Sequence, residues 1–283
     1  MTLLPSYTTW LREQSTTPLE EGLYDPGVLK VVFMAGAAGS GKSYTVAYIA
    51  DIDSDEMRGI RPELAKKTMW VGATGLRTIN SDIAFTRSLR KAGIDPASLD
   101  NIEKTNPELW QQIQGTPETI RGRAFRLTDA QRLAILQGRL GMLYDSTGQN
   151  YSATKFDKDD FTRLGYDTMM VFVNTPLEVA LRQNASRPRR LPDSIIQTVW
   201  QKTHNNIQEY LRLFGSDRFI EFFNIRNDEM TPEQRHAFES TLKPHQSANM
   251  ARVRTKVQNF VKAPVENPLG QAWMQAEREK RRR

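Results

Sequence analysis

The sequence contains no cysteine, which excludes disulfide bonds and metal sites built from thiolates. Its three histidines, His204, His236 and His245, do not have the spacing of a metal-binding set. No stretch has the roughly 20 apolar residues that a membrane-spanning helix needs, and residues 1–27 lack the apolar core of a signal peptide. We therefore expect a cytoplasmic protein whose 283 residues form one large domain with extensions, or two small domains.

One glycine-rich segment, Gly36-x-x-x-x-Gly41-Lys42-Ser43, has the spacing of a phosphate-binding loop, or P-loop. Apolar residues 29–35 precede it with the character of a buried strand, and a helical pattern follows as far as residue 51. This order of strand, loop and helix is the context in which the motif is meaningful. The alternative is a glycine-rich turn that binds nothing.

The residue types of the loop suit a nucleoside triphosphate. Glycines allow positive φ angles, so that backbone N–H groups point at a phosphate beside the positive end of the following helix. Lys42 would bridge the β- and γ-phosphates, and the Ser43 hydroxyl would bind Mg²⁺. We expect ATP to contact the whole loop: Gly36, Ala37, Ala38, Gly39, Ser40, Gly41, Lys42, Ser43 and Tyr44.

Apolar segments alternate with helical patterns, which predicts an α/β fold with a parallel five-stranded sheet and helices on both faces. The expected strands are residues 29–35, 77–80, 141–145, 168–174 and 219–224. The expected helices include residues 83–92, 127–136, 157–164, 177–184, 193–213 and 231–242. We divide the chain into an N-terminal arm (1–28), a central P-loop domain (29–242) with a substrate-side insertion (94–118) and a lid (182–192), and a C-terminal extension (243–283).

Two acidic residues follow strands whose carboxyl ends should lie beside the P-loop, where such sheets bind ligands. Asp82, directly after the strand at 77–80, could accept the proton of an attacking hydroxyl as a general base. Alternatively, Asp82 or Ser81 caps the next helix. Asp145 could hold Mg²⁺ directly or through water, or it could simply be a turn aspartate, because Asp-Ser-Thr-Gly is also good turn chemistry.

Four arginines, Arg182, Arg187, Arg189 and Arg190, gather at a helix end and in a proline-containing loop. Mobile arginines can close over phosphates, exclude water and stabilise charge on a transferred group. We therefore predict a lid here, with Arg187 and Arg190 as its catalytic members. The alternative is a solvated basic loop.

A family resemblance rests on three segments: the P-loop, Ile79-Asn80-Ser81-Asp82, and Val173-Asn174-Thr175-Pro176-Leu177-Glu178 with the arginines that follow it. With these segments, residues 29–225 resemble small P-loop kinases, in particular the zeta-toxin family and the polynucleotide kinases with their bacteriophage relatives. The resemblance implies an ATP- and Mg²⁺-dependent kinase, in which Asp82 is the base and the arginines form the lid. Residues 94–118 and the segment after residue 242 have no counterpart that we can place, so we expect them to set the substrate.

The net charge of +6 is concentrated near the C-terminus. Residues 243–283 carry ten Lys or Arg against three Glu, so the rest of the chain is close to neutral. Such a tail attracts polyanions, DNA and other nucleic acids above all, unless it only improves solubility. Together with the resemblance, this charge leads us to expect an acceptor hydroxyl on nucleic acid. The phage relatives suggest the hydroxymethyl group of a modified base, such as 5-hydroxymethyluracil in DNA.

Other functions stay open. A 5′-hydroxyl polynucleotide kinase is the close variant, and a zeta-toxin-like kinase of nucleotide sugars would not need the basic tail. A P-loop motor or switch is less well supported, because no apolar strand ends in paired Asp-Glu. A nucleic-acid-binding module with an inactive P-loop is opposed by the intact loop and by Asp82. Trp110, Trp200 and Tyr151 could stack on a flipped base, although aromatic side chains are more often buried in a core.

Overall fold

The computed structural model describes residues 22–51, 74–114, 116–186, 191, 193–225 and 230–282. Within these ranges, no helix is both long enough and apolar enough to cross a membrane. Most of the expected N-terminal arm, and residues 187–190 and 192 of the expected lid, lie outside the described residues.

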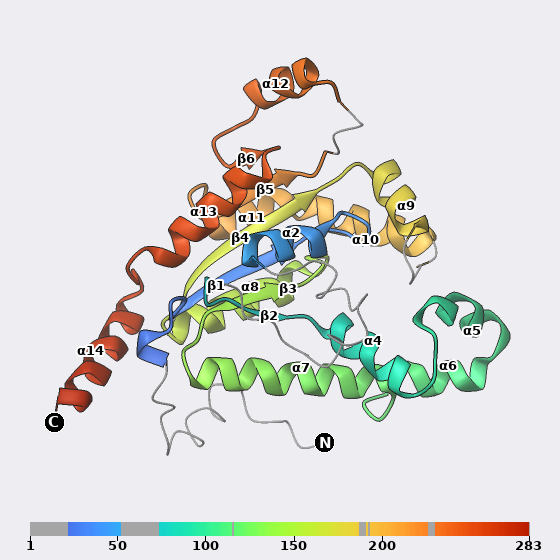
Figure 1. The fold of residues 1–283 in the computed structure, drawn as a ribbon, viewed down its shortest axis with the longest axis horizontal. Helices are drawn as coiled ribbons and strands as arrows, with labels where there is room; N and C mark the ends of the chain where they lie inside the picture. The colour runs from blue at the N-terminus through green and yellow to red at the C-terminus, as the bar shows by residue number, and fades with distance from the viewer. Residues whose placement is uncertain are drawn as a thin grey trace.

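The centre of the fold is a parallel sheet with strands in the order β2-β3-β1-β4-β5-β6 (Figure 1). The strands are β1 (Lys30–Ala35), β2 (Arg77–Ile79), β3 (Met142–Asp145), β4 (Asp167–Asn174), β5 (Phe219–Phe223) and β6 (Gln246–Ser247). The first five match the expected segments, whereas β6 corrects the expected count of five strands to six. It pairs in parallel with β5, and its two residues are too few to give a periodic pattern in the sequence.

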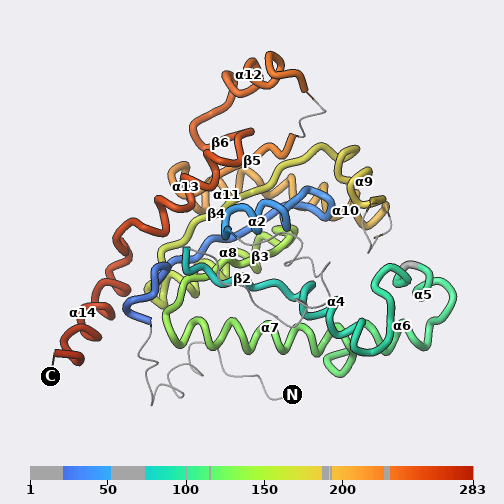
Figure 2. Tube along the Cα trace, viewed as in Figure 1, coloured from blue at the N-terminus to red at the C-terminus, as the bar shows by residue number. Residues whose placement is uncertain are grey.

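Helices cover both faces of this sheet, as the tube in Figure 2 shows. In chain order they are η1 (Gly22–Tyr24), α2 (Lys42–Ala50), α4 (Ser81–Lys91), η2 (Pro96–Ser98), α5 (Leu99–Thr105), α6 (Pro107–Ile113), α7 (Ile120–Gln137), α8 (Tyr151–Arg163), α9 (Leu177–Ala185), α10 (Asp193–Asn205), α11 (Ile207–Phe214), α12 (Pro232–Ser240), α13 (Met250–Lys262) and α14 (Pro268–Arg282).

The central strand β1 is buried along its whole length, because its side chains alternate between two hydrophobic cores. Val32 belongs to the core on one face, which includes Val257 of α13. Phe33 points to the other face, where its ring packs 5.7 Å from that of Phe161 on α8 and 5.4 Å from that of Phe214 on α11. A parallel strand covered on both faces reads in the sequence as one continuous apolar run, which is the pattern of residues 29–35.

A third, smaller core holds α4 to α6 and the start of α7 together, at the right of Figure 1. Its buried residues include Phe85 and Leu89 of α4, Ile113 of α6 and Ala124 of α7. The segment 94–118 thus contains η2, α5 and α6, which are short helices packed against α4 and α7.

The start of α7 differs from the expected helix at 127–136, because the helix begins at Ile120. Thr119 provides the cap, since its hydroxyl accepts a hydrogen bond from the N–H of Gly122 at 3.2 Å. Thr128, which we expected near a helix start, lies inside the helix and donates to the carbonyl of Ala124 instead. Its hydroxyl is thus satisfied within the helix, so Thr128 does not mark the helix start.

Two further helices have other bounds than expected. The helix expected at 157–164 begins at Tyr151, because the side chain of Asn150 accepts from the N–H of Ala153 and caps it. The single helix expected at 193–213 is divided into α10 and α11 at Asn206. The amide of Asn206 donates to the carbonyl of Gly148 at 3.0 Å, so this residue joins the break to the loop after β3.

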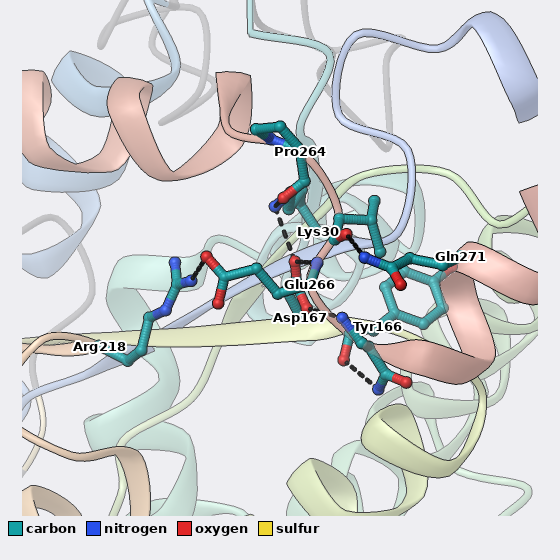
Figure 3. Close-up of polar contacts among 9 residues, drawn as sticks. Lys30, Tyr166, Asp167, Arg218, Pro264, Glu266 and Gln271 are labelled. Carbon is teal, nitrogen blue, oxygen red and sulfur yellow. Dashed lines mark hydrogen bonds and ion pairs between the residues drawn. The ribbon is translucent and has the colours of Figure 1, made fainter.

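The C-terminal part of the chain is fixed to the sheet by a buried group that we call the C-terminal clasp: Lys30, Asp167, Pro264, Glu266 and Asn267 (Figure 3). The ammonium group of Lys30 lies 2.8 Å from the Asp167 carboxylate and donates to the carbonyl of Pro264 at 3.1 Å. Asp167 also accepts from the backbone N–H groups of Glu266 and Asn267, both at 2.9 Å. Lys30 and Asp167 begin β1 and β4, so the clasp lies at the amino ends of the strands, opposite the P-loop.

The residues that the sequence analysis assigned to a C-terminal extension differ in their burial. Helix α13 contributes Val253, Val257, Phe260 and Val261 to the core. Helix α14 is mostly exposed and ends in Lys280, Arg281 and Arg282. The positive charge of this segment is therefore divided between a packed helix and a helix that extends along the outside (Figure 1).

Candidate active site

The P-loop connects the carboxyl end of β1 to the start of α2, as the sequence predicts. Gly36, Gly39 and Gly41 all have positive φ angles, of 150°, 82° and 84°. Gly39 also has no room for a side chain, because a Cβ atom there would lie 2.2 Å from the carbonyl oxygen of Ala180. These glycines let the loop wrap tightly before α2 begins at Lys42.

Two side chains that directly follow the neighbouring strands β4 and β5 donate hydrogen bonds to the backbone of the loop. The carbonyl of Ser40 accepts from the hydroxyl of Thr175 at 3.0 Å and from the amide of Asn224 at 2.8 Å. The buried hydroxyl of Ser40 itself has no hydrogen-bond partner among the described residues. A buried polar group without a partner is costly, so this hydroxyl suits a loop that receives phosphate oxygens.

Lys42 and Asp145, which the sequence analysis placed near each other, are in direct contact. The Lys42 ammonium group lies 2.5 Å from one carboxylate oxygen of Asp145, and the Asn80 amide lies 2.5 Å from the other. Asn80 in turn accepts from the backbone N–H of Asp82 at 2.7 Å. These contacts form one chain, Lys42–Asp145–Asn80–Asp82, across the ends of the adjacent strands β1, β3 and β2.

Asp145 is buried, with 2% of its side chain exposed. Burial raises the pKa of this carboxyl group, while the charge of Lys42 and the hydrogen bonds from Lys42 and Asn80 lower it. The charge of Asp82 raises the pKa again. Among the described residues, no group of three or more acidic or histidine side chains could hold a metal ion alone. One carboxylate and the Ser43 hydroxyl nevertheless suit Mg²⁺, which usually takes few protein ligands beside phosphates and water.

Asp82 lies in the first turn of α4, immediately after β2. Its side chain is 48% exposed, so a substrate can reach it. Asn80 caps α4, which removes the alternative that Ser81 or Asp82 is the capping residue. Arg121 of α7 binds Asp82 at 2.7 Å. Arg121 could not be found from the sequence, because no local pattern reveals that two residues 39 positions apart meet where the first turns of α4 and α7 pack together.

The arginines of the expected lid are described only in part. Arg182 is an exposed residue in the last turn of α9, whereas Arg187, Arg189 and Arg190 lie outside the described residues. The buried side chain of Asn184 donates to the carbonyl of Leu191 at 2.8 Å and accepts from its N–H at 3.1 Å. Residues 184 and 191, which flank Arg187, Arg189 and Arg190 in the sequence, are thereby held against each other.

The three candidate stacking residues are engaged within the protein. The ring of Trp200 stacks on His204 with ring centroids 3.8 Å apart, and its N–H donates to the carbonyl of Thr175 behind the P-loop. Tyr151 packs against the second hydrophobic core, and Trp110 packs against the small core of α4 to α7. Burial lowers the pKa of His204.

No protein-family model and no curated protein matches the chain. Among solved structures, one from the PezAT chromosomal toxin–antitoxin system of Streptococcus pneumoniae is similar over 99% of this chain and 98% of that chain, with 11% identity and a TM-score of 0.45. A structure of AvrRxo1-ORF1:-ORF2 with ATP is similar over 96% of this chain and 88% of that chain, with 13% identity and a TM-score of 0.42. A structure of the same pair with sulphate ions gives 15% identity, 96% and 83% coverage, and a TM-score of 0.40. At such low similarity, the activity has to be inferred from the chain's own residues.

Proposed function

We propose that the protein is an ATP-dependent kinase that transfers the γ-phosphate of ATP to a hydroxyl group. The observation that carries this proposal is the contact chain from Lys42 through Asp145 and Asn80 to Asp82. It runs from the P-loop lysine to the backbone N–H of Asp82, and the accessible carboxylate of Asp82 lies at the same edge of the sheet. A phosphate donor and a hydroxyl acceptor could therefore meet between the P-loop and Asp82.

The proposed reaction is an in-line displacement. The acceptor hydroxyl oxygen forms a bond to the γ-phosphorus, the bond from that phosphorus to the β–γ bridging oxygen breaks, and ADP leaves. The Asp82 carboxylate takes the hydroxyl proton, while Lys42 neutralises charge on the phosphates. Ser43 and Asp145 would hold Mg²⁺, which screens the phosphate charge. In this proposal, Arg187 and Arg190 add positive charge from the lid.

We further propose that the acceptor hydroxyl is attached to nucleic acid, with the hydroxymethyl group of a modified base such as 5-hydroxymethyluracil in DNA as the most specific candidate. The basic residues near the C-terminus support this choice, because they can hold a phosphate backbone without reading its sequence. A 5′-hydroxyl end and a nucleotide sugar are the alternative acceptors.

Substitution of the proposed base tests the reaction. Asp82→Asn keeps the shape of the side chain but cannot take a proton, so transfer should fall about 10²- to 10⁴-fold while ATP still binds. Asp159→Asn on α8 is the matched control, because Asp159 is also partly exposed and, among the described residues, pairs only with Lys155 on its own helix. Radiolabelled ATP, offered with DNA, hydroxymethyluracil-containing DNA, nucleosides and nucleotide sugars, identifies the acceptor.

The outcomes separate the functional classes. A labelled acceptor that disappears in Asp82→Asn and persists in Asp159→Asn supports the kinase. ATP hydrolysis that labels none of the acceptors indicates a motor or switch, and ATP binding without turnover indicates a binding module. Near-normal transfer by Asp82→Asn would show that Asp82 is not the base.

A further inference from the structure

Arg121 and Asp82 meet although they belong to different helices. Arg121 is in the first turn of α7 and Asp82 in the first turn of α4, and one guanidinium N–H group of Arg121 donates to the Asp82 carboxylate at 2.7 Å. The Arg121 side chain is 23% exposed. The pair therefore lies at the surface of the proposed acceptor site rather than deep in a core.

Two aromatic rings lie close to the Arg121 guanidinium. The ring centroid of Phe85, a buried residue of α4, lies 4.7 Å from the central guanidinium carbon, and that of Phe125, one turn along α7, lies 4.5 Å from it. Cation–π contacts with two rings restrict the orientations that the guanidinium can adopt. An arginine held in this way recognises other groups through its edge, where its N–H groups point.

Most of that edge is unused within the described part of the chain. A guanidinium has five N–H donors, and Arg121 makes one hydrogen bond there, to Asp82. The ion pair with Asp82 sets the direction of the edge. The remaining donors thus lie beside the carboxylate that would receive the acceptor's proton, in a planar arrangement that matches the oxygens of a phosphate.

We propose that Arg121 binds a phosphate group of the acceptor and thereby determines which hydroxyl reaches Asp82. The selection of the hydroxyl rests on the proposed function, because only a kinase needs a hydroxyl at Asp82. The binding of phosphate by Arg121 does not. Arg121 would then contact both the base and the acceptor: one N–H group binds the Asp82 carboxylate, and the others bind a phosphate of the acceptor. The acceptor is accordingly a phosphate-bearing molecule, whether a nucleic acid or a nucleotide derivative. Phe125, with 48% of its surface exposed, is the more accessible of the two rings beside the arginine.

Phosphate binding can be measured without any transfer reaction. The P-loop is first filled with a non-hydrolysable ATP analogue and Mg²⁺, and inorganic phosphate is then titrated calorimetrically. Arg121→Met should weaken phosphate binding about ten- to a hundredfold, the loss expected for a charged hydrogen bond. Arg121→Lys, which keeps the charge but loses the planar edge, should lie between Arg121→Met and the wild type.

Arg123→Met is the matched control. Arg123 is an exposed arginine of the same helix whose guanidinium donates to the carbonyl of Glu118, so its loss should leave phosphate binding unchanged. Phe125→Leu preserves the arginine and removes only its contact with the Phe125 ring, which should weaken phosphate binding a few-fold. This second variant keeps the test valid if Arg121→Met does not fold.

The proposal about Arg121 and the proposed kinase activity can fail separately. Phosphate binding that depends on Arg121, in a protein that labels no acceptor, supports the phosphate site and contradicts the kinase. The phosphate site is contradicted if the wild type transfers phosphate but does not bind inorganic phosphate. It is also contradicted if the wild type transfers phosphate and Arg121→Met binds inorganic phosphate equally well. Where transfer is found, Arg121→Met should raise the KM for the acceptor and leave the KM for ATP unchanged. Equal changes in both KM values would indicate a structural role only.

Discussion

At the scale of single residues, two neighbours on β3, Tyr144 and Asp145, have different roles: Tyr144 packs in the core and Asp145 lies in the proposed active site. Asp145 contacts the P-loop lysine, whereas Tyr144 packs against the second core, where its ring meets that of Phe33. The Tyr144 hydroxyl donates to the Asp157 carboxylate at 3.1 Å. Burial and the charge of Asp157 together raise the pKa of Tyr144 to about 12, although the charge of Arg132 acts against them.

This pKa predicts a loss of stability at alkaline pH. The folded protein keeps the Tyr144 proton up to pH about 12, whereas the unfolded chain releases it near pH 10. The stabilisation is therefore complete below pH 10 and is lost as the pH rises through this window, by about 2 to 3 kcal/mol in total. Urea denaturation from pH 9 to about 12 gives the free energies of unfolding of the wild type and of Tyr144→Phe. The difference between these two free energies should change over this range. A constant difference over the window would contradict the shifted pKa.

The individual residues of the site differ in how far the sequence could predict them. Lys42 follows from a fixed spacing, and Asp82 and Asp145 follow from their places after apolar strands, because parallel strands bring such ends to one edge. The contact of Asn80 with Asp145 and the role of Arg121 could not be predicted. Asn80 looks like an ordinary helix cap, and Arg121 acquires its role only when α7 packs along α4.

At the scale of elements, the C-terminal clasp joins the start of β1 and β4 to the segment before α14. Only 1% of the Lys30 side chain and 9% of the Asp167 side chain are exposed, so breaking their ion pair leaves a buried charge without its partner. We expect Lys30→Met to lower the free energy of unfolding by about 3 to 5 kcal/mol. Urea denaturation measures the change, and limited proteolysis of α14 shows whether the helix is released.

A control for this prediction lies within the same clasp. Glu266 forms an exposed ion pair with Arg218 at 2.6 Å, and only its backbone N–H binds Asp167. Glu266→Gln removes the exposed charge alone and should cost less than about 1 kcal/mol. A similar effect of both substitutions would show that the buried pair contributes no more than a surface pair does.

Elements with a strong local signal were predicted better than elements that depend on distant contacts. The central strands read as apolar runs, and the helix expected from residue 231 is α12, where Thr231 and Gln234 form a capping box. In contrast, β6 exists only through its pairing with β5, and the break at Asn206 depends on carbonyl groups of a loop more than 50 residues earlier. Such contacts arise from the assembled fold and leave no periodic pattern in the sequence.

At the scale of the whole molecule, the proposed active site and the basic end of α14 lie at opposite edges of the sheet (Figure 1). The P-loop follows the carboxyl end of β1, while α14 begins beside the clasp at the amino ends of β1 and β4. The eight residues of β4 span about 25 Å between these edges. A small acceptor at Asp82 could not also contact α14, whereas a polymer could contact both, so involvement of α14 would favour nucleic acid over a nucleotide sugar.

Charge substitution tests this better than deletion, because deleting residues 243–283 would also remove the core side chains of α13. The test variant replaces the last basic turn of α14 with glutamine: Lys280→Gln, Arg281→Gln and Arg282→Gln. If these side chains contact phosphates, the plot of log DNA affinity against log salt concentration should be less steep for this variant than for the wild type. The slope should be smaller in magnitude by about 2 to 3. The matched control removes three exposed charges elsewhere: Lys155→Gln, Arg163→Gln and Arg212→Gln. An unchanged slope in the α14 variant, or an equal change in the control, would remove α14 from the proposed nucleic-acid contact and leave the acceptor to be recognised at Asp82 and Arg121 alone.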